Sequence, residues 1–271
     1  MTLSEQKEQL GSLLKAVRRS RKYRHIHEDL VVSIGSRELS KEKSLQDAVK
    51  ATKSKLHQVC GAYFAVRPDY DRWTKELREA LTIGEEAFRL KCQEIMGLHS
   101  STRERLPFLD EFYSKIFSHL PPIHSIVDMA CGFNPLAIPW MPVEEGARYQ
   151  AYDVYYDLVE FLNEFMGISG VDGMAEARDI TLRPPEDGAD LALILYSIPC
   201  LDKIDGSASG RLLDSIDARH LVVSFPIRTL GGVRKGMREH YAKRFDQLME
   251  GRSWETSNLN FDTELVYLIE K

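Results

Sequence analysis

The sequence predicts an α/β protein in which a parallel sheet follows an N-terminal all-helical domain. In residues 1–100, apolar positions recur every three or four residues and no alternating run competes with them. After residue 120, short apolar segments alternate with helical ones, and runs such as LALIL at 191–195 are typical of strands covered on both faces. We therefore expect a helical domain at 1–100 and an α/β domain at 101–271.

The periodicity predicts five helices in the first domain. They are Ser4–Ser20, Glu28–Arg37, Ser44–Val59, Asp71–Leu81 and Glu85–Met96. In the first of them, Leu10, Leu13 and Val17 share one face. A further helix should begin at Ser101, because Ser101-Thr102-Arg103-Glu104 has the capping-box spacing, and the two prolines at 121–122 should end it.

The second domain should contain a doubly wound sheet. The expected strands are Ser125–Met129, Arg148–Asp153, Met174–Arg178, Asp190–Tyr196 and Arg219–Phe225. Helical stretches near Asp157–Met166, Ser207–Ile216 and Arg238–Met249 are interspersed with them. The last two apolar runs, Trp254–Leu259 and Thr263–Ile269, predict a terminal hairpin.

Composition bounds the class of protein. The 271 residues are 43% hydrophobic, which predicts a packed core. The longest apolar run, Leu191–Leu201, is too short to span a bilayer, and the N-terminus lacks the apolar segment of a signal peptide. The 4 cysteines show no C-x-x-C spacing, which argues against a disulfide framework and a zinc site. We expect a cytoplasmic protein with no membrane partner and no metal.

Charge is divided unevenly along the chain. The net charge is −5, yet residues 1–60 contain thirteen Lys/Arg against seven Asp/Glu. A basic module joined to an acidic one predicts a docking surface for a polyanion, the alternative being an ordinary helical surface with scattered cations. The candidate RNA-binding cations of this module are Lys15, Arg18, Arg21, Lys22, Arg24, Lys53 and Lys55.

A second basic segment, SFPIRTLGGVRKG, follows the fifth expected strand at 224–236. Its glycines let the backbone approach a phosphate, and Arg228, Arg234 and Lys235 would neutralise one. A flexible surface loop is the alternative, but the clustering of cations favours contact with a nucleic-acid substrate.

The segment HSIVDMACGFNP at 124–135 is the first candidate for a ligand site. A short apolar strand ends there in a tight turn, and ligands of such sheets bind at the carboxyl ends of the strands. Asp128, Asp153 and Asp179 end or follow the first three strands. Any single acid of this kind is often a helix cap or a solvated turn, but three at one edge favour a nucleotide-like ligand. Asp153 would accept ribose hydroxyls and Asp179 an adenine amino group.

The start of the Ser101 helix offers backbone N–H groups, with Arg105 one turn further on. This arrangement suits a carboxylate or phosphate, although a plain capping box with a surface arginine gives the same pattern. An amino-acid carboxylate together with adenosine is the outline of S-adenosylmethionine. No Walker A motif or triple-glycine fingerprint points to ATP or NAD instead.

Pro199-Cys200, after the fourth expected strand, raises a covalent alternative. Cytosine-C5 methyltransferases attack their base with a cysteine that follows a proline at this place. A small buried cysteine beside a loop is the structural alternative.

Several segments, spread nearly end to end, resemble the Arm/Rmt aminoglycoside-resistance methyltransferases, which modify N7 of guanine 1405 in 16S ribosomal RNA. They are Lys22-Tyr23-Arg24, Leu56-His57, CGAY at 60–63, LHSSTRERL at 98–106, VDMACGFNPLA at 127–137, SFPIRTLGG with KGM at 224–237, and TELVYLI at 263–269. The resemblance implies a Rossmann-like class I S-adenosylmethionine-dependent sheet and helices that dock on the 30S subunit. One position departs, since Tyr196 stands where several members have lysine.

The resemblance also implies the residues that bind S-adenosylmethionine. They are Phe64, His99, Ser100, Ser101, Arg105, Ala130, Gly132, Asp153, Asp179, Ile180 and Leu195. Guanine N7 carries a lone pair and no proton, so we expect no catalytic base or nucleophile. Positioning of the reactants alone can lower the activation barrier by about 7–11 kcal/mol. The target base must be unstacked or flipped, and RNA contacts must offset that cost. The alternatives kept open are a cytosine-C5 enzyme that uses Cys200 and a non-catalytic ribosome-binding homologue.

Overall fold

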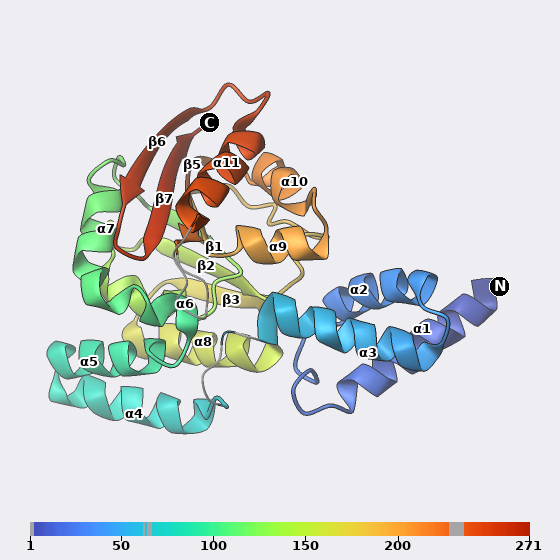
Figure 1. The fold of residues 1–271 in the computed structure, drawn as a ribbon. Helices are drawn as coiled ribbons and strands as arrows, with labels where there is room; N and C mark the ends of the chain where they lie inside the picture. Colours follow the sequence, from blue (N-terminus) through green and yellow to red (C-terminus); the bar gives the residue numbers. More distant parts are fainter. Residues whose placement is uncertain (1–2, 62, 64–66, 228–235) are drawn as a thin grey trace.

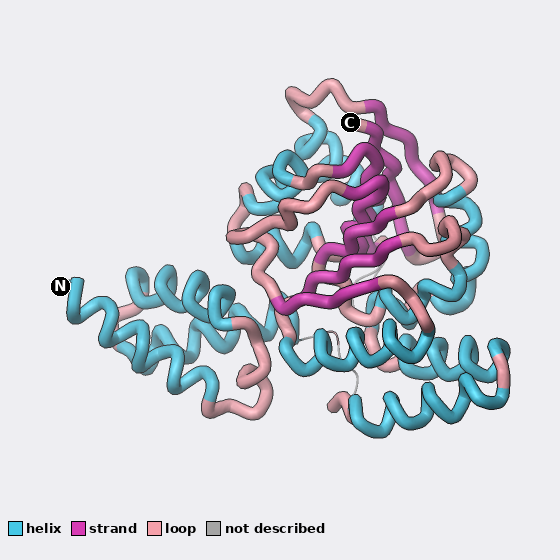
Figure 2. The backbone as a smooth tube through the Cα atoms, turned by 180° about the vertical axis from the view of Figure 1, so that it is seen from behind, coloured by secondary structure: helices cyan, strands magenta, loops and turns pink. Residues whose placement is uncertain are grey.

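The computed structural model describes residues 3–61, 63, 67–227 and 236–271. A seven-stranded sheet forms the centre of the molecule, and helices cover both of its faces (Figures 1 and 2). Three N-terminal helices form an arm on one side of this body, and the N-terminus lies at the far end of the arm (Figure 1). Across the described ranges, no helix is both long and apolar enough to span a membrane.

The sheet confirms the predicted strands. They are β1 (Ser125–Met129), β2 (Arg148–Asp153), β3 (Gly173–Ala177), β4 (Ala189–Leu195), β5 (Ala218–Pro226), β6 (Glu255–Asn260) and β7 (Glu264–Glu270). Their order is β3-β2-β1-β4-β5-β7-β6. The first five strands run parallel, whereas β7 pairs antiparallel with β5 and forms the terminal hairpin with β6. The carboxyl ends of β1 to β5 therefore meet at one edge.

Each central strand is buried on both faces, because successive side chains point to opposite sides. In β1, Ile126 joins one hydrophobic cluster and Val127 the other. The first cluster contains α7 (Leu109–Phe117), the 3-10 turn η3 (Asn134–Trp140) and α8 (Tyr156–Ser169). The second contains α9 (Ile198–Ile204), α10 (Ala208–Ser215) and α11 (Met237–Met249).

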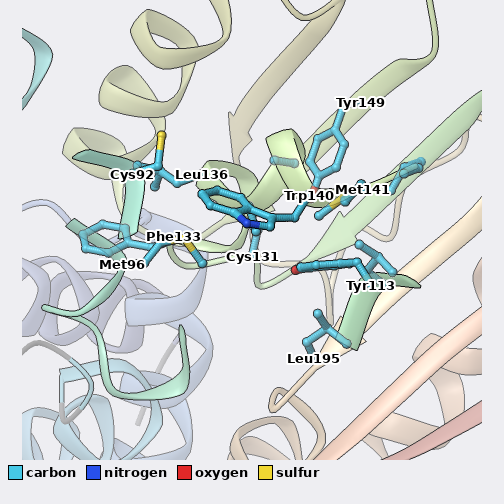
Figure 3. Packing of buried hydrophobic residues seen from close by; sticks show 14 of the residues in the cluster. Cys92, Met96, Tyr113, Cys131, Phe133, Leu136, Trp140, Met141, Tyr149 and Leu195 are labelled. Atoms are coloured by element: carbon cyan, nitrogen blue, oxygen red, sulfur yellow. The ribbon is translucent and has the colours of Figure 1, made fainter. Parts of the chain in front are cut away.

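Two helices of the predicted helical domain pack with the sheet rather than with the arm. They are α4 (Tyr70–Ile83) and α5 (Glu85–Met96), whose side chains Trp73 and Phe88 belong to the same cluster as Phe165 of α8. Figure 3 shows Cys92 and Met96 of α5 in this cluster with Leu136, Trp140 and Met141. The predicted boundary near residue 100 thus lies within one packed body, and we propose that the helical domain ends near residue 61.

The arm has a hydrophobic cluster of its own. The arm consists of α1 (Leu3–Arg18), α2 (Glu28–Lys41) and α3 (Leu45–Leu56), followed by a π-helical turn, η1 (His57–Gly61). Leu13, Leu30 and Leu56 are buried at its centre. Val154, Tyr155 and Ile204 of the sheet domain pack against this cluster, so the arm is attached at the segment after β2 and at the end of α9.

The continuous helix predicted from Ser101 is wrong. The segment forms α6 (Ser100–Arg103), a 3-10 turn η2 (Leu106–Phe108) and then α7. Pro107 lacks the N–H that an uninterrupted helix needs there, which explains the break. His99 is the N-cap of α6 and makes no side-chain cap bond, while Glu104 accepts a hydrogen bond from the Tyr196 hydroxyl at 3.2 Å. The capping box is therefore not formed.

Two smaller differences lie beside the site. The predicted helix Ser44–Val59 gives way at His57 to the π-helical turn, and α9 occupies a segment for which no helix was predicted. Pro199 lies in the first turn of α9, where its missing N–H would have no helical partner. All four cysteines are free and buried.

Candidate functional site

A pocket lies at the carboxyl edge of the sheet. Much of its wall comes from the turns after β1, β2, β3 and β4, as expected for a doubly wound sheet. The lining residues are Leu30, Val59, Cys60, Tyr63, His99, Ser101, Ala130, Gly132, Tyr152, Asp153, Val154, Tyr155, Leu158, Arg178, Asp179, Ile180, Leu195, Tyr196, Ser197, Cys200, Leu201 and Ile204.

Asp153 ends β2 and is held rigidly at the pocket. Its Oδ1 accepts hydrogen bonds from the backbone N–H groups of Val154 at 2.7 Å and Tyr155 at 3.2 Å. Its Oδ2 accepts one from the N–H of Gly132 at 3.0 Å. Burial raises the pKa of Asp153, and these three N–H donors oppose the shift because they stabilise the carboxylate. The second oxygen retains acceptor capacity for a ligand hydroxyl.

Asp179 follows β3 and presents an unsatisfied acceptor. Its Oδ1 accepts from the hydroxyl of Thr181 at 2.6 Å and from the Thr181 N–H at 3.0 Å. Its Oδ2 has no hydrogen-bond partner, and water cannot supply one because the residue is only 1% exposed. A buried acceptor of this kind is costly unless a ligand donates to it. Asp179 therefore marks a place for an N–H donor.

The turn after β1 brings its backbone close to a histidine. Gly132 has a φ of +52°, and a Cβ built on it would lie 3.1 Å from Cε1 of His99. Only glycine fits both conditions without strain. Burial lowers the pKa of His99 to about 3, with Arg103 as a smaller cause, so this ring is neutral at physiological pH. Its Nδ1 lies 2.9 Å from the Ser101 hydroxyl.

Tyr63 forms a wall of the pocket that the sequence did not indicate. Its ring stacks on His99 with centroids 5.6 Å apart, and its hydroxyl is hydrogen-bonded to Sγ of Cys200 at 2.7 Å. Its carbonyl accepts from the N–H of Ser100 at 2.9 Å. Ser100 thus anchors Tyr63 and is not among the lining residues, and its N–H is already bonded within the protein.

Arg105 lies behind the pocket and not in its lining. Its guanidinium donates from Nε and Nη2 to the two carboxylate oxygens of Glu264 at 3.0 and 2.7 Å, and from Nη1 to Asn134 at 2.9 Å. Asn134 in turn donates to Asp128 at 2.9 Å, which connects Arg105 to the end of β1. Contact between Arg105 and a cofactor carboxylate stays a prediction.

The structure brings most of the sequence-predicted cofactor residues together. Those that line the pocket are His99, Ser101, Ala130, Gly132, Asp153, Asp179, Ile180 and Leu195. Ser100 and Arg105 lie outside its lining, and Phe64 lies outside the described residues. The residues that sequence reasoning missed include Tyr63, Val59 and Cys60, whose place in the wall depends on how the arm packs. In the described part of the chain, no cluster of three or more His, Cys, Asp or Glu is arranged to hold a metal ion.

The predicted RNA-binding cations of the arm lie around one corner of it. Arg21, Lys22 and Arg24 are exposed in the turn between α1 and α2. Lys22 Nζ is 2.8 Å from Nδ1 of His57, which places this turn beside the last turn of α3. Lys53 and Lys55 lie in that last turn, whereas Lys15 and Arg18 lie in the last turn of α1. Arg228, Arg234 and Lys235 lie outside the described residues.

The sheet order, the antiparallel β7 and the pocket over β1 to β4 define a class I methyltransferase fold. Residues 19–268 match the family model described as ribosomal RNA methyltransferase (FmrO). The protein belongs to this family of ribosomal RNA methyltransferases.

Curated relatives and solved structures agree with this assignment. The chain is 32% identical to the 16S rRNA (guanine(1405)-N(7))-methyltransferase of Micromonospora rosea over the full length of both. It is 34% identical to the enzyme of the same name from Serratia marcescens, covering 97% of this chain and 98% of that one. The structure of 16S rRNA methyltransferase RmtF in complex with S-adenosyl-L-homocysteine superposes with a TM-score of 0.84, at 30% identity over 97% of this chain and 98% of that one. For the 16S rRNA methylase RmtB, the TM-score is 0.78 at 30% identity, with the same coverage.

Proposed function

We propose that this protein transfers the methyl group of S-adenosylmethionine to N7 of guanine 1405 in 16S rRNA, within the 30S subunit. Two relatives that match nearly the whole chain carry this activity in their names. The observation in the structure that supports it best is the paired placement of Asp153 and Asp179 in one pocket. Modification of the decoding region would give aminoglycoside resistance, and a ribosomal target implies a cytoplasmic protein.

The pocket residues fit an adenosine-containing cofactor. The unpartnered Oδ2 of Asp179 would accept the adenine amino group, and the free lone pair of Asp153 Oδ2 would accept a ribose hydroxyl. Ile180 and Leu195 are buried apolar residues of the lining that would contact the adenine faces. When bound, S-adenosylmethionine supplies an electrophilic methyl group on a sulfonium.

The chain's own contribution is positioning and exclusion of water. Guanine N7 has an in-plane lone pair and needs no base to remove a proton, so the site has to hold the base in line with the methyl group. His99 is neutral and lies 2.9 Å from the Ser101 hydroxyl, so it adds no positive charge to a pocket that would hold a sulfonium. Most of the lining is apolar or aromatic, which keeps the reacting atoms away from solvent.

Cytosine-C5 methylation through Cys200 is disfavoured. A nucleophilic cysteine needs a lowered pKa, whereas burial raises the pKa of the Cys200 thiol. The thiol is also engaged with the Tyr63 hydroxyl. The unsatisfied oxygen of Asp179 points to a bound ligand, and methyl incorporation decides between an enzyme and a ribosome-binding homologue that only holds the cofactor. Tyr196, which motivated that alternative, is buried and donates a hydrogen bond to Glu104.

The cations of the arm would supply the RNA contacts. Arg21, Lys22 and Arg24 are exposed together in one turn, as binding to several phosphates requires. Because A-form RNA hides its base edges in a narrow groove, docking of this kind reads shape and phosphates more than sequence. Such contacts would offset the few kcal/mol that flipping the target base costs.

The experiment that tests this function compares methyl incorporation into 30S subunits, 50S subunits and protein-free 16S rRNA, using labelled S-adenosylmethionine. We expect incorporation into the 30S subunit. The variant Asp153→Ala should lose both S-adenosylhomocysteine binding and incorporation, while it binds 30S subunits as the wild type does without cofactor. Incorporation by Asp153→Ala at the wild-type rate would contradict the proposed site.

A further inference from the structure

The segment that leads into α2 is hydrogen-bonded to the strand end that carries Asp153. The N–H of His27 donates to the carbonyl of Val154 at 2.7 Å, and the N–H of Tyr156 donates to the carbonyl of His25 at 2.8 Å. Between these two bonds, Ile26 and Tyr155 form an antiparallel bridge. Ile26 is fully buried. The arm is therefore joined to the sheet domain by a short two-stranded pairing.

The same segment contacts the turn that carries Asp179. Asp29 pairs with Nη2 of Arg183 at 2.8 Å, and Nε2 of His27 lies 3.4 Å from the same Nη2. The backbone N–H of Arg183 donates to the carbonyl of Asp179 at 2.9 Å. One short stretch of the arm thus reaches both acids of the pocket, each through a neighbouring residue.

These contacts bear on the geometry of the pocket. The peptide groups of Val154 and Tyr155 donate to Oδ1 of Asp153, so the segment paired with the arm also orients that carboxylate. Leu30, Val59 and Cys60 of the arm line the pocket directly. A movement of the arm would therefore remove one wall and release the peptide groups that hold Asp153.

We propose that residues 25–30 are a positioning element of the cofactor site, through which cofactor binding and docking of the arm on RNA strengthen each other. The inference rests on the proposed function, because it takes the exposed cations Lys22 and Arg24 as RNA contacts. These cations immediately precede the segment, so RNA that fixes the arm also fixes the wall of the pocket. Both ligands favour the same arrangement of arm and sheet, and the coupling is reciprocal by linkage.

His27 allows a single bond of this pairing to be removed. Its φ of −53° and ψ of 134° are compatible with proline, but His27→Pro puts a ring carbon where the N–H bonds Val154, which removes the bond and pushes the Val154 carbonyl away. The matched control is His27→Ala, which keeps the N–H and, like proline, lacks the side-chain acceptor that His27 offers to the N–H of Asp29. Both variants lose the imidazole and its cap bond, so their difference reports the backbone pairing.

The test is calorimetric titration of the full chain with S-adenosylhomocysteine. We expect His27→Pro to bind at least about threefold more weakly than His27→Ala, threefold being near the lower end of the range for loss of one hydrogen bond. If thermal unfolding curves show that both variants are folded and their affinities are equal, the positioning role is overturned. If His27→Pro does not fold, the affinity of Arg183→Gln for S-adenosylhomocysteine is compared with that of Arg78→Gln. Equal affinities of these two variants would overturn the positioning role in the same way. Arg78 forms an exposed ion pair of similar length with Glu164, far from the segment in sequence.

The coupling is tested by repeating the measurement with saturating 30S subunits. We expect the wild type to bind S-adenosylhomocysteine about fivefold or more tightly in their presence, and this factor to shrink in His27→Pro. An unchanged affinity, in a wild type that still methylates the 30S subunit, would overturn the coupling and leave the proposed function standing. A wild type that binds no S-adenosylhomocysteine would overturn both.

Discussion

Arg105 and Glu264 form a bidentate ion pair in which both side chains are excluded from water. Their exposed fractions are 1% and 0%, and the two nitrogen–oxygen distances are 3.0 and 2.7 Å. The pair joins the segment after α6 to the beginning of β7, and the guanidinium also lies 4.3 Å from the centroid of the Phe112 ring. It thus connects the turn that carries His99 and Ser101 to the terminal hairpin.

Removing one partner of this pair should destabilise the fold strongly. We expect Glu264→Gln to lower the free energy of unfolding by about 3–5 kcal/mol, because the arginine is left buried without its counter-charge. Urea denaturation measures the change. The control is Glu270→Gln at the other end of β7, where the pair with Arg219 is exposed and its loss should have little effect. Equal losses in the two variants would show that the buried pair is not a special stabilising contact.

Asp128 should make stability depend on pH. Burial raises its pKa to about 6 from an ordinary value of 3.8, although hydrogen bonds from Tyr149 and Asn134 oppose the shift. The folded state therefore holds the proton more tightly, and stability falls as pH rises from about 4 to about 6, by about 3 kcal/mol. Asp128→Asn keeps a carbonyl acceptor and should lack this fall. Urea denaturation at pH 4, 5, 6 and 7 checks it, and identical pH profiles of the two proteins would refute the assignment.

Gly132→Ala should damage the cofactor site beyond the strain of its backbone. A positive φ costs an alanine about 1–2 kcal/mol, and here the new Cβ also meets His99 at 3.1 Å. Gly146→Ala is the matched control, since its φ is +73° and no atom lies within 4 Å of the added Cβ. We expect both variants to lose stability but only Gly132→Ala to lose affinity for S-adenosylhomocysteine. Unchanged affinity in Gly132→Ala would place the ligand away from this turn.

Cys200→Ala distinguishes methylation of a ring nitrogen from methylation of cytosine C5. Transfer to guanine N7 uses no protein nucleophile, so the variant should retain most of its activity on 30S subunits, and its loss should be limited to the hydrogen bond with Tyr63. Steady-state incorporation of labelled methyl groups checks this. Complete loss of transfer in a folded variant would favour the covalent mechanism instead.

Charge removal from the arm should weaken RNA docking. We expect the triple variant that replaces Lys22, Arg24 and Lys55 with glutamine to bind 30S subunits less tightly. The slope of log affinity against log salt concentration should become shallower by roughly 0.7–0.9 for each phosphate that the arm no longer neutralises. Cofactor affinity of the isolated protein should stay unchanged, because none of the three lines the pocket. A control variant removes three exposed cations of α4, which are Arg72, Lys75 and Arg78. If the control variant bound 30S subunits just as weakly, the effect would come from net charge and not from the position of the arm cations.

The sequence predicted the sheet more accurately than the helices around it. Strand limits agree within a few residues, because the apolar runs of a buried parallel sheet are bounded by polar turns. The break at Pro107 was missed because Leu106, Leu109 and Phe112 keep helical spacing across it. That spacing describes which side chains are apolar, and it does not report the missing N–H of proline.

The candidate site was predictable where it depends on strand ends and not where it depends on packing. Asp153 and Asp179 follow neighbouring strands, and parallel strands bring their carboxyl ends together. The pairing of Arg105 with Glu264, which is 159 residues away in the sequence, could not be predicted, and contact of Arg105 with an anionic ligand stays a prediction. No local pattern reports such a partner. The wall supplied by Leu30, Val59 and Cys60 likewise follows only from how the arm attaches.

The most direct test of the proposed function is to map the nucleotide that carries the methyl group. Purified 30S subunits would be incubated with the protein and S-adenosylmethionine, and the 16S rRNA would be cleaved chemically at 7-methylguanine. We predict a single new cleavage at guanine 1405. Methylation at another nucleotide, or at a cytosine, would contradict the proposed target, and no incorporation by a protein that binds S-adenosylhomocysteine would mean that the fold serves another substrate.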